Sequence, residues 1–210
     1  MLRIGVLISG SGRTLQNFID LIARRELDAT IAVVISSLAK VKGVDRARAA
    51  GLPVEIVRVK DHPDVDEFSR RVVEALERHD VQLACQAGWT AYWRIPRRWM
   101  GRVMNIHPAL LPKYGGKGFY GHHVHEAVLA SGDTESGCTV HFANNEYDAG
   151  PIILQRRCPV LPGDTPEALA DRVFEQELLA YPEAIRLFAA GKARMPQEAT
   201  KPQCSETTKG

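Results

Sequence analysis

The feature that most constrains this chain is the alternation of short apolar runs with helical patterns through its first half. Four runs are apolar at nearly every position, as in strands that are buried on both faces of a sheet. They cover residues 3–8, 31–35, 54–59 and 81–87. Between them, apolar residues recur at helical spacing, over residues 15–22, 44–50 and 65–79. This order predicts βαβ units, a parallel sheet and right-handed crossovers.

The second half of the chain has a different pattern. A further strand is expected at 103–106, a helix at 121–131, and two strands at 138–143 and 152–160 whose connecting turn allows them to run antiparallel. A last long helix is expected from Thr165 to about Ala190, with Pro166 in its first turn and Pro182 as a candidate kink. We therefore predict an α/β fold with a Rossmann-like, mixed but mostly parallel sheet and helices on both faces.

Size and composition indicate an ordinary globular protein. The chain has 210 residues, 45% of them hydrophobic, which favours one domain, expected over residues 1–192. Residues 193–210 are mostly polar and predict a disordered tail. The formal net charge of +2 indicates neither a nucleic-acid nor a membrane partner. The amino-terminal apolar run is too short for a signal peptide or a membrane span, so we expect a cytoplasmic protein.

The cysteines point to the same compartment. None of the four forms a CxxC pair, and the first three lie in or near apolar, strand-like runs; they are Cys85, Cys138, Cys158 and Cys204. We interpret them as buried free thiols in a reducing environment.

A glycine-rich loop follows the first strand directly. Its residues are Gly10, Ser11, Gly12, Arg13 and Thr14, and a helix follows them. Small residues let a ligand approach the backbone, while the start of the helix offers free N–H groups, so the loop suits phosphate better than it suits a turn that binds nothing. A dinucleotide is disfavoured because the third glycine of the fingerprint is Leu15 and no acid ends the second strand. A small phosphate ester fits best.

The segment Asn105-Ile106-His107-Pro108 ends the strand expected at 103–106. Pro108 favours extended geometry at His107, so the side chains of Asn105 and His107 should project to the same side. A carboxamide can donate to a developing oxyanion, and an imidazole can move a proton near neutral pH. The pair therefore suits acyl transfer, although this segment alone does not exclude an ordinary structural histidine.

Longer motifs extend this interpretation. The stretches NIHPALLPKY and SGCTVHF…EYDAGPIIL resemble the core signature of the folate-dependent formyltransferases, and the resemblance covers residues 2–192. The loop SGSGRTLQN resembles the members that formylate glycinamide ribonucleotide. The resemblance thus implies the formyltransferase fold and transfer of the formyl group of 10-formyltetrahydrofolate to the amine of glycinamide ribonucleotide, a step of purine biosynthesis.

The resemblance also implies roles for individual residues. Asn105, His107 and Asp148 correspond to the catalytic residues. The loop from Gly10 to Thr14 corresponds to the phosphate site, and Glu177 to the acid that faces the acceptor ribose. The folate pocket corresponds to Trp89, Thr90, Ala91, Tyr92 and Trp93, together with Asn105. The family's chemistry implies no metal, with two small-molecule substrates, and the expected assembly is a monomer or a homodimer.

Three segments depart from the commonest family pattern. Residues 89–93 differ from the sequence that the family usually has in the folate pocket. Arg13 stands where a small polar residue is usual, and residues 117–122 are an insertion. These departures bear on the binding of the donor more than on the reaction.

Several alternatives share part of this evidence. A formyltetrahydrofolate hydrolase, or a formyltransferase for another amine, would use the same three catalytic residues. A metal-dependent hydrolase would have to use His122, His123 and His125, whose spacing is not that of a ligand set. A nucleotide-binding module without catalysis would not need Asn105, His107 and Asp148 together.

Overall fold

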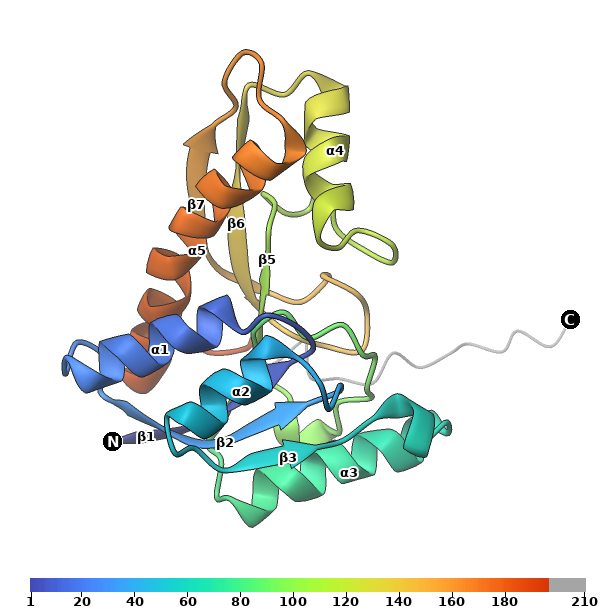
Figure 1. Cartoon of the computed structure of the whole chain (residues 1–210), viewed down its shortest axis with the longest axis vertical. Helices are drawn as coiled ribbons and strands as arrows, with labels where there is room; N and C mark the ends of the chain where they lie inside the picture. Colours follow the sequence, from blue (N-terminus) through green and yellow to red (C-terminus); the bar gives the residue numbers. More distant parts are fainter. Residues whose placement is uncertain (197–210) are drawn as a thin grey trace, which may run out of the picture.

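The computed structural model describes residues 1–196, and its centre is one sheet of strand order β3-β2-β1-β4-β5-β6-β7 (Figure 1). The strands are β1 (Leu2–Ile8), β2 (Ala29–Ser36), β3 (Val54–Ile56), β4 (Leu83–Gln86), β5 (Val103–His107), β6 (Glu135–Phe142) and β7 (Ile152–Pro159). Pairing is parallel from β3 through β5, while β6 runs antiparallel to both β5 and β7. The predicted mixed, mostly parallel sheet is confirmed.

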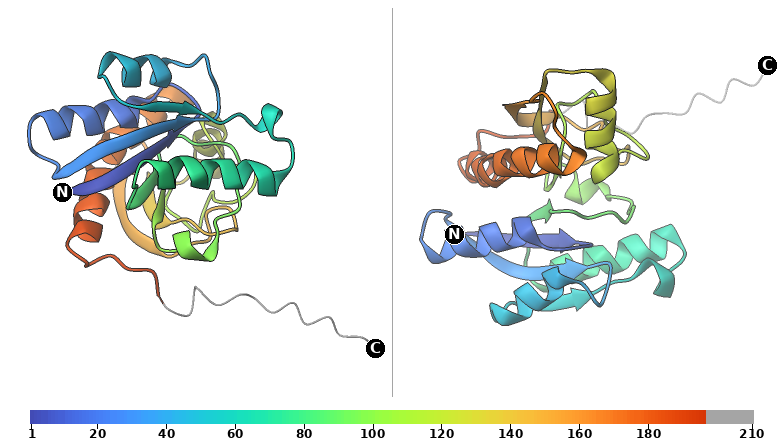
Figure 2. Two further views of the ribbon diagram at one scale, coloured as in Figure 1. Left: turned by 90° about the horizontal axis from the view of Figure 1, so that it is seen from below. Right: turned by 45° about the horizontal axis from the view of Figure 1, so that its top comes forward.

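Helices cover both faces of the sheet, as predicted (Figure 2). They are α1 (Arg13–Ala23), α2 (Lys42–Ala49), α3 (Val65–Arg78), α4 (His122–Ser131) and α5 (Pro166–Ala189), with short 3₁₀ turns η1 (Val59–Asp61) and η2 (Arg97–Trp99). Buried residues of α1 and α5 share one core cluster with β1, and those of α3 share another with β1 and β2.

Alternation along β1 explains the two cores. Val6 and Ile8 are completely buried against the α1 and α5 side, whereas Leu7 is completely buried against the α3 side. A strand that is buried on both faces must be apolar at every position, which is the pattern in the sequence. Gly5 permits the close approach of α3, since a Cβ there would lie 2.7 Å from the side chain of Leu76.

The strand predicted over 54–59 is shorter than expected. β3 is an edge strand that pairs only with Val34–Ser36 of β2, and its pairing stops at Ile56. Since β2 ends at Ser36, no partner remains beyond that point, and the chain turns into η1. An apolar pattern alone does not reveal where the neighbouring strand ends.

Helix α5 continues through Pro182. A proline has no N–H, so the carbonyl of Leu178, four residues earlier, loses its helical partner. The side-chain amide of Asn17 in α1 donates to that carbonyl at 2.9 Å. A contact from another helix thus satisfies the group that Pro182 leaves free, and the helix does not end there.

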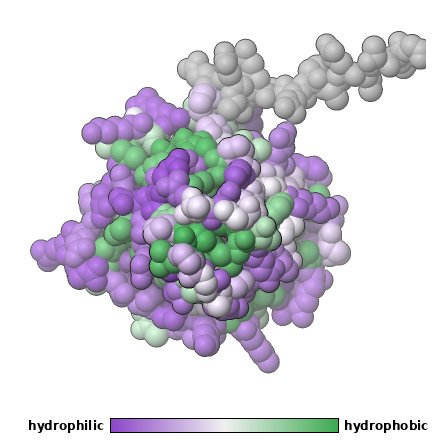
Figure 3. Space-filling model, turned by 90° about the horizontal axis from the view of Figure 1, so that it is seen from above, coloured by the Kyte–Doolittle hydropathy of each residue, from purple (hydrophilic) through white to green (hydrophobic). Residues whose placement is uncertain are grey.

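The end of the described chain still packs on the protein. Ala193 and Met195 lie against the core cluster that contains α5, while the rest of the predicted tail, residues 197–210, lies outside the described residues. No described helix is long and apolar enough to cross a membrane. Seen from the end that carries α4, hydrophilic side chains surround smaller apolar areas (Figure 3).

Three of the four cysteines behave as predicted. Cys85, Cys138 and Cys158 are free and buried. Burial is the main cause that raises the pKa of each thiol, to about 12 for Cys138. A thiol with a raised pKa is a poor nucleophile, so these side chains are packing residues. Cys204 lies outside the described residues.

Candidate active site

The candidate site lies where the strand order reverses. β1 and β4 are adjacent and parallel, but the chain leaves β1 toward β2 on one side and leaves β4 toward β5 on the other. The loops that follow β1 and β4 touch, since Ser9 N–H donates to the carbonyl of Gly88 at 3.0 Å. A cavity of about 770 Å³ opens there. In doubly wound sheets this is the position of the ligand site.

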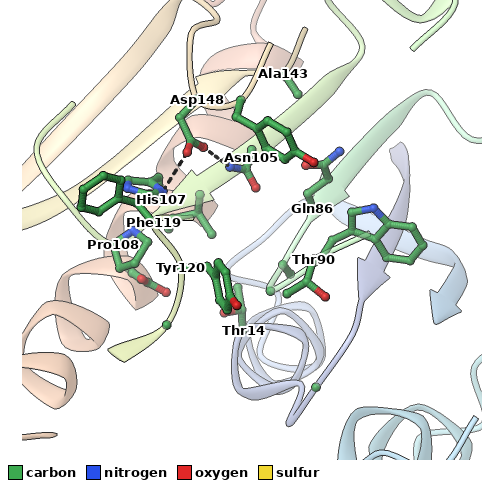
Figure 4. Close-up of a pocket in the computed structure, with 18 of the residues that line it drawn as sticks. Thr14, Gln86, Thr90, Asn105, His107, Pro108, Phe119, Tyr120, Ala143 and Asp148 are labelled. Carbon is green, nitrogen blue, oxygen red and sulfur yellow. Dashed lines mark hydrogen bonds and ion pairs between the residues drawn. The ribbon is translucent and has the colours of Figure 1, made fainter. Parts of the chain in front are cut away.

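Three predicted residues meet in this cavity. Asn105 and His107 lie on β5, and Asp148 lies on the turn between β6 and β7. The carboxylate of Asp148 lies 3.4 Å from Nδ1 of His107, and it accepts from Nδ2 of Asn105 at 3.3 Å. Figure 4 shows Asp148 joined to both side chains. The structure therefore brings together a carboxamide, an imidazole and a carboxylate.

The backbone around Asp148 aims its carboxylate into the cavity. Asp148 adopts a φ of 54°, a left-handed conformation that is uncommon for a residue with a side chain. Two residues later, a Cβ on Gly150 would lie 1.7 Å from the carbonyl oxygen of Phe142, so only glycine fits there. The N–H of Gly116 also donates to Oδ2 of Asp148 at 3.0 Å. Strain at a left-handed residue is typical of functional sites.

His107 is held from both ring nitrogens. Nε2 donates to the carbonyl of Tyr114 at 2.7 Å, and Nδ1 faces Asp148. A carboxylate this close to an imidazole favours its charged form and so acts to raise its pKa. Burial of a side chain only 3% exposed outweighs this effect, and the pKa of His107 is lowered. His107 is therefore mainly neutral at physiological pH.

The pKa of the Asp148 carboxyl is lowered. Burial acts to raise it, but the hydrogen bond with His141, the charge that His107 can carry and the N–H of Gly116 together outweigh burial. Asp148 is thus ionised at neutral pH beside a neutral imidazole. Such a pair can hold and release a proton between its two members.

His141 is a second buried imidazole at the site, and its position was not predicted. Nδ1 donates to the carbonyl of Phe142 at 3.0 Å, and Nε2 lies 3.2 Å from Nδ2 of Asn105 and 3.6 Å from the carboxylate of Asp148. His141 stands opposite Asn105 in the pairing of β5 with β6. Its place depends on the register between two strands, and local sequence does not give that register.

The glycine loop presents the start of α1 to the cavity. Gly12 precedes the helix with a φ of 69°, and no side chain caps the first N–H groups. A Cβ on Gly12 would lie 2.6 Å from the Cα of Gly43, so this glycine serves the packing of α2, whereas Gly10 has open space. Thr14 is buried and lines the cavity with the rest of the loop. The free N–H groups suit an anion.

Arg13 extends toward α5. Its guanidinium lies 3.1 Å from the carboxylate of Asp171 and 3.8 Å from the centre of the Phe174 ring. Glu177, also on α5, lines the cavity. Burial raises the pKa of this carboxyl to about 7, against the opposing charge of Arg13. The loop and the predicted ribose acid therefore share one wall of the cavity.

All five residues of the segment 89–93 line the same cavity. Tyr92 and Tyr147 face each other with ring centres 5.5 Å apart. The hydroxyl of Tyr92 donates to the carbonyl of Asn145 at 3.3 Å, which joins this segment to the turn that carries Asp148. Both rings are partly exposed, at 36% and 48%. They provide flat apolar surface for an aromatic ligand.

The three histidines at the start of α4 have different surroundings. Within residues 1–196, no group of three histidine, cysteine or acidic side chains is arranged to hold a metal ion. His125 is 4% exposed and lines the cavity, and burial lowers its pKa to about 4. His123 is exposed and faces Glu126 at 3.3 Å.

Fold and site together define a class: an α/β protein whose cavity joins a glycine loop that suits an anion to side chains that suit acyl transfer. Comparison with known proteins agrees, since the model of the formyl transferase family matches residues 2–185. The chain belongs to the formyl transferase family.

Individual relatives cover nearly the whole chain. A glycinamide ribonucleotide transformylase 1 from Symbiobacterium toebii has a crystal structure with a TM-score of 0.87 and 41% identity, over 94% of this chain and 92% of that one. Phosphoribosylglycinamide formyltransferase of Haemophilus influenzae is 37% identical over 93% of this chain and 91% of its own length. A trifunctional purine biosynthetic protein of Drosophila pseudoobscura pseudoobscura is 41% identical over 95% of this chain, which spans only 14% of that relative.

Proposed function

We propose that this protein transfers the formyl group of 10-formyltetrahydrofolate to the amine of glycinamide ribonucleotide. The observation that carries the proposal is the position of Asn105, His107 and Asp148 between the glycine loop and the segment 89–93, in one cavity. A phosphorylated acceptor and an aromatic donor would meet at these three side chains. The similarity to phosphoribosylglycinamide formyltransferases supports the same acceptor.

The acceptor is held by its phosphate and ribose in this proposal. The phosphate lies on the N–H groups at the start of α1, with Ser11 and Thr14 adding hydroxyl groups. Glu177 faces the ribose from α5. The free amine then points toward β5, where the catalytic side chains lie.

The donor lies along the segment 89–93 in this proposal. Its ring system lies against Trp89 and the Tyr92–Tyr147 pair, with the formyl group toward Asn105. Bringing two substrates into one cavity supplies much of the rate, because the bimolecular encounter becomes a local one.

Asn105 stabilises the negative oxygen that forms when the acceptor amine attacks the formyl carbon. Its amide nitrogen faces His141 at 3.2 Å and Asp148 at 3.3 Å, distances at the long end for N–H donors. A developing oxyanion is a stronger hydrogen-bond acceptor than a neutral group. It can therefore take one N–H of the Asn105 side chain. The C–N bond to the folate nitrogen then breaks.

Proton movement accompanies this exchange of bonds. The attacking amine loses one proton, and the folate nitrogen that leaves gains one. Asp148, ionised and partly buried, accepts the proton from the amine through water, and His107 stabilises the protonated carboxyl through Nδ1. The chemistry is complete without a metal ion, and we place the protein in the cytoplasm as a monomer or homodimer.

A spectroscopic assay tests the function. Purified protein is mixed with 10-formyl-dideazafolate and glycinamide ribonucleotide, and loss of the formyl group is followed by absorbance. We expect a rate that depends on the acceptor and is unchanged by EDTA. A rate that is equal without glycinamide ribonucleotide would indicate a hydrolase instead.

A further inference from the structure

The segment proposed for the donor has no regular secondary structure. It lies between β4, which ends at Gln86, and η2, which begins at Arg97. Within residues 1–196, no hydrogen bond between backbone groups involves residues 89–95, although all of 89–93 line the cavity. Backbone groups that do not pair with other backbone need side chains or water as partners. Side chains from elsewhere must therefore set the conformation of this segment.

Ser9, at the carboxyl end of β1, holds the beginning of the segment. Its side chain is buried, and Oγ accepts from the N–H of Thr90 at 2.9 Å. The same oxygen lies 2.6 Å from the hydroxyl of Ser37, which is also buried. The N–H of Ser9 donates to the carbonyl of Gly88 at 3.0 Å. Ser9 thus contacts the backbone on both sides of Trp89.

Ser69 holds the end of the segment from α3. It is only 5% exposed and belongs to the buried residues of this helix, with Val72 and Val73. Its hydroxyl donates to the carbonyl of Val65 at 2.5 Å and accepts from the N–H of Arg94 at 2.7 Å. Alanine favours a helix more than serine does and would bury no polar atom. The bond to Arg94 therefore gives this serine a role that alanine could not fill.

Neither serine is part of the cavity wall, so neither is in a position to touch a ligand there. A third contact holds Ile95, whose N–H donates to Oδ1 of Asn145 at 2.7 Å, but Asn145 is exposed. Water competes for hydrogen-bonding groups at an exposed contact and much less at a buried one. The two buried hydroxyls are therefore the main supports of the segment.

We propose that Ser9 and Ser69 are positioning residues for the donor: they hold residues 90 and 94, so that the side chains between them form the pocket before the donor arrives. The inference rests on the proposed function for the identity of this ligand. A pocket that is already formed binds more tightly, because binding does not have to order the loop. Loss of either hydroxyl should therefore weaken donor binding without touching the reacting groups.

A binding experiment tests this role without relying on catalysis. The unreactive folate 5,10-dideazatetrahydrofolate is titrated into wild type, Ser9→Ala, Ser69→Ala and the double variant by calorimetry. We expect Kd to rise about three- to tenfold in each single variant, the value of one ordinary hydrogen bond. In the double variant, the rise should be roughly the product of the two single effects.

Ser36→Ala is the matched control. Ser36 is a completely buried serine at the end of β2, and its hydroxyl donates to the carbonyl of Leu38 at 2.6 Å. Its hydrogen bonds do not reach residues 89–95. The substitution therefore removes a buried hydroxyl without releasing the donor segment, and Kd for the folate should stay within about twofold of wild type.

Two further readouts separate positioning from a general loss of stability. Without any ligand, hydrogen–deuterium exchange of residues 89–95 should be faster in Ser9→Ala and Ser69→Ala than in wild type, and unchanged in Ser36→Ala. In the reaction, KM for the donor should rise as Kd does, while KM for glycinamide ribonucleotide stays within about twofold.

An unchanged folate Kd in both single variants, an equal rise in Ser36→Ala, or an equal rise of KM for both substrates would overturn the inference. If exchange changes as expected but wild type does not bind the folate, the two serines still position the segment, and it is the proposed function that is contradicted.

Discussion

At the residue scale, Asp148 is the point on which the proposed chemistry depends. Its carboxylate contacts Asn105, His107, His141 and the N–H of Gly116. A carboxylate with so many partners stays ionised, and it stands where the amine would lose its proton. Its left-handed backbone is part of the same arrangement.

Replacing Asp148 with Asn removes the charge but keeps the shape. We expect kcat to fall by about 100- to 10,000-fold, because a general base contributes roughly that much. Circular dichroism and thermal unfolding should remain close to wild type, which separates catalysis from folding. Near-normal turnover in this variant would exclude Asp148 from the proton path.

Glu177 gives a pH-dependent prediction. Its pKa is about 7 in the folded protein, against 4.5 ordinarily, so the native state holds its proton more tightly than the unfolded chain does. The stability that this group contributes is present in full below about pH 4.5 and is lost as the pH rises through about 7. The comparison is the free energy of unfolding of Glu177→Gln minus that of wild type. We expect this difference to be roughly 1–3 kcal/mol larger at pH 8 than at pH 4.5.

Urea unfolding of both proteins at the two pH values measures this difference. Equal effects of the substitution at both pH values would mean that burial does not raise the pKa of Glu177.

At the scale of elements, α5 is joined to the sheet beneath the site by Tyr181. The Tyr181 hydroxyl lies 3.0 Å from the carbonyls of both Gln86 and Met104, at the ends of β4 and β5. Its ring meets Phe18 of α1 edge-on, with centres 5.2 Å apart. One side chain thus fixes the strands that carry Gln86 and Asn105 relative to two helices.

Tyr181→Phe removes a single oxygen atom, but it should lower the stability of the fold measurably. It removes a buried hydroxyl whose single hydrogen is shared between these two carbonyls, and we expect the free energy of unfolding to fall by about 1–3 kcal/mol. Leu179→Ala on the same helix is the control: Leu179 is 53% exposed, and its loss should cost within about 0.5 kcal/mol. Denaturant titration compares the two, and equal effects would contradict the role of the hydroxyl.

Sequence patterns predicted the helices and strands well, because the spacing of apolar residues that identifies them is a local feature of the sequence. A strand such as β1, which is buried from Ile4 to Ile8, must be free of polar side chains there, and the alternation within β5 placed Asn105 and His107 on the same side. Contacts between distant segments were not predictable in this way. His141 reaches Asn105 through the pairing of β5 with β6, and the end of β3 is set by the end of β2.

The site shows the same division. The family resemblance supplied Asp148, and the structure brings it to the other two side chains. The resemblance did not show that the pKa of His107 is lowered, because the sequence does not reveal how completely that ring is buried. Nor did the sequence predict that Arg13 would turn toward Asp171 and Phe174, which depends on where α5 packs.

At the scale of the whole molecule, the account depends on two ligands sharing one cavity. The doubly wound half of the sheet provides the glycine loop, and the antiparallel strands β6 and β7 provide the turn that carries Asp148. β5 lies between the two halves and carries Asn105 and His107. The two parts of the fold therefore meet at the side chains proposed to be catalytic.

A crystal structure with glycinamide ribonucleotide and an unreactive folate analogue tests this arrangement most directly. The account predicts the phosphate on the N–H groups of residues 12–14, the folate ring against 89–93, and the acceptor amine within about 3.5 Å of the atom that replaces the formyl carbon, beside Asn105 and Asp148. A phosphate bound elsewhere, or an amine held on the far side of the cavity from these two residues, would contradict it.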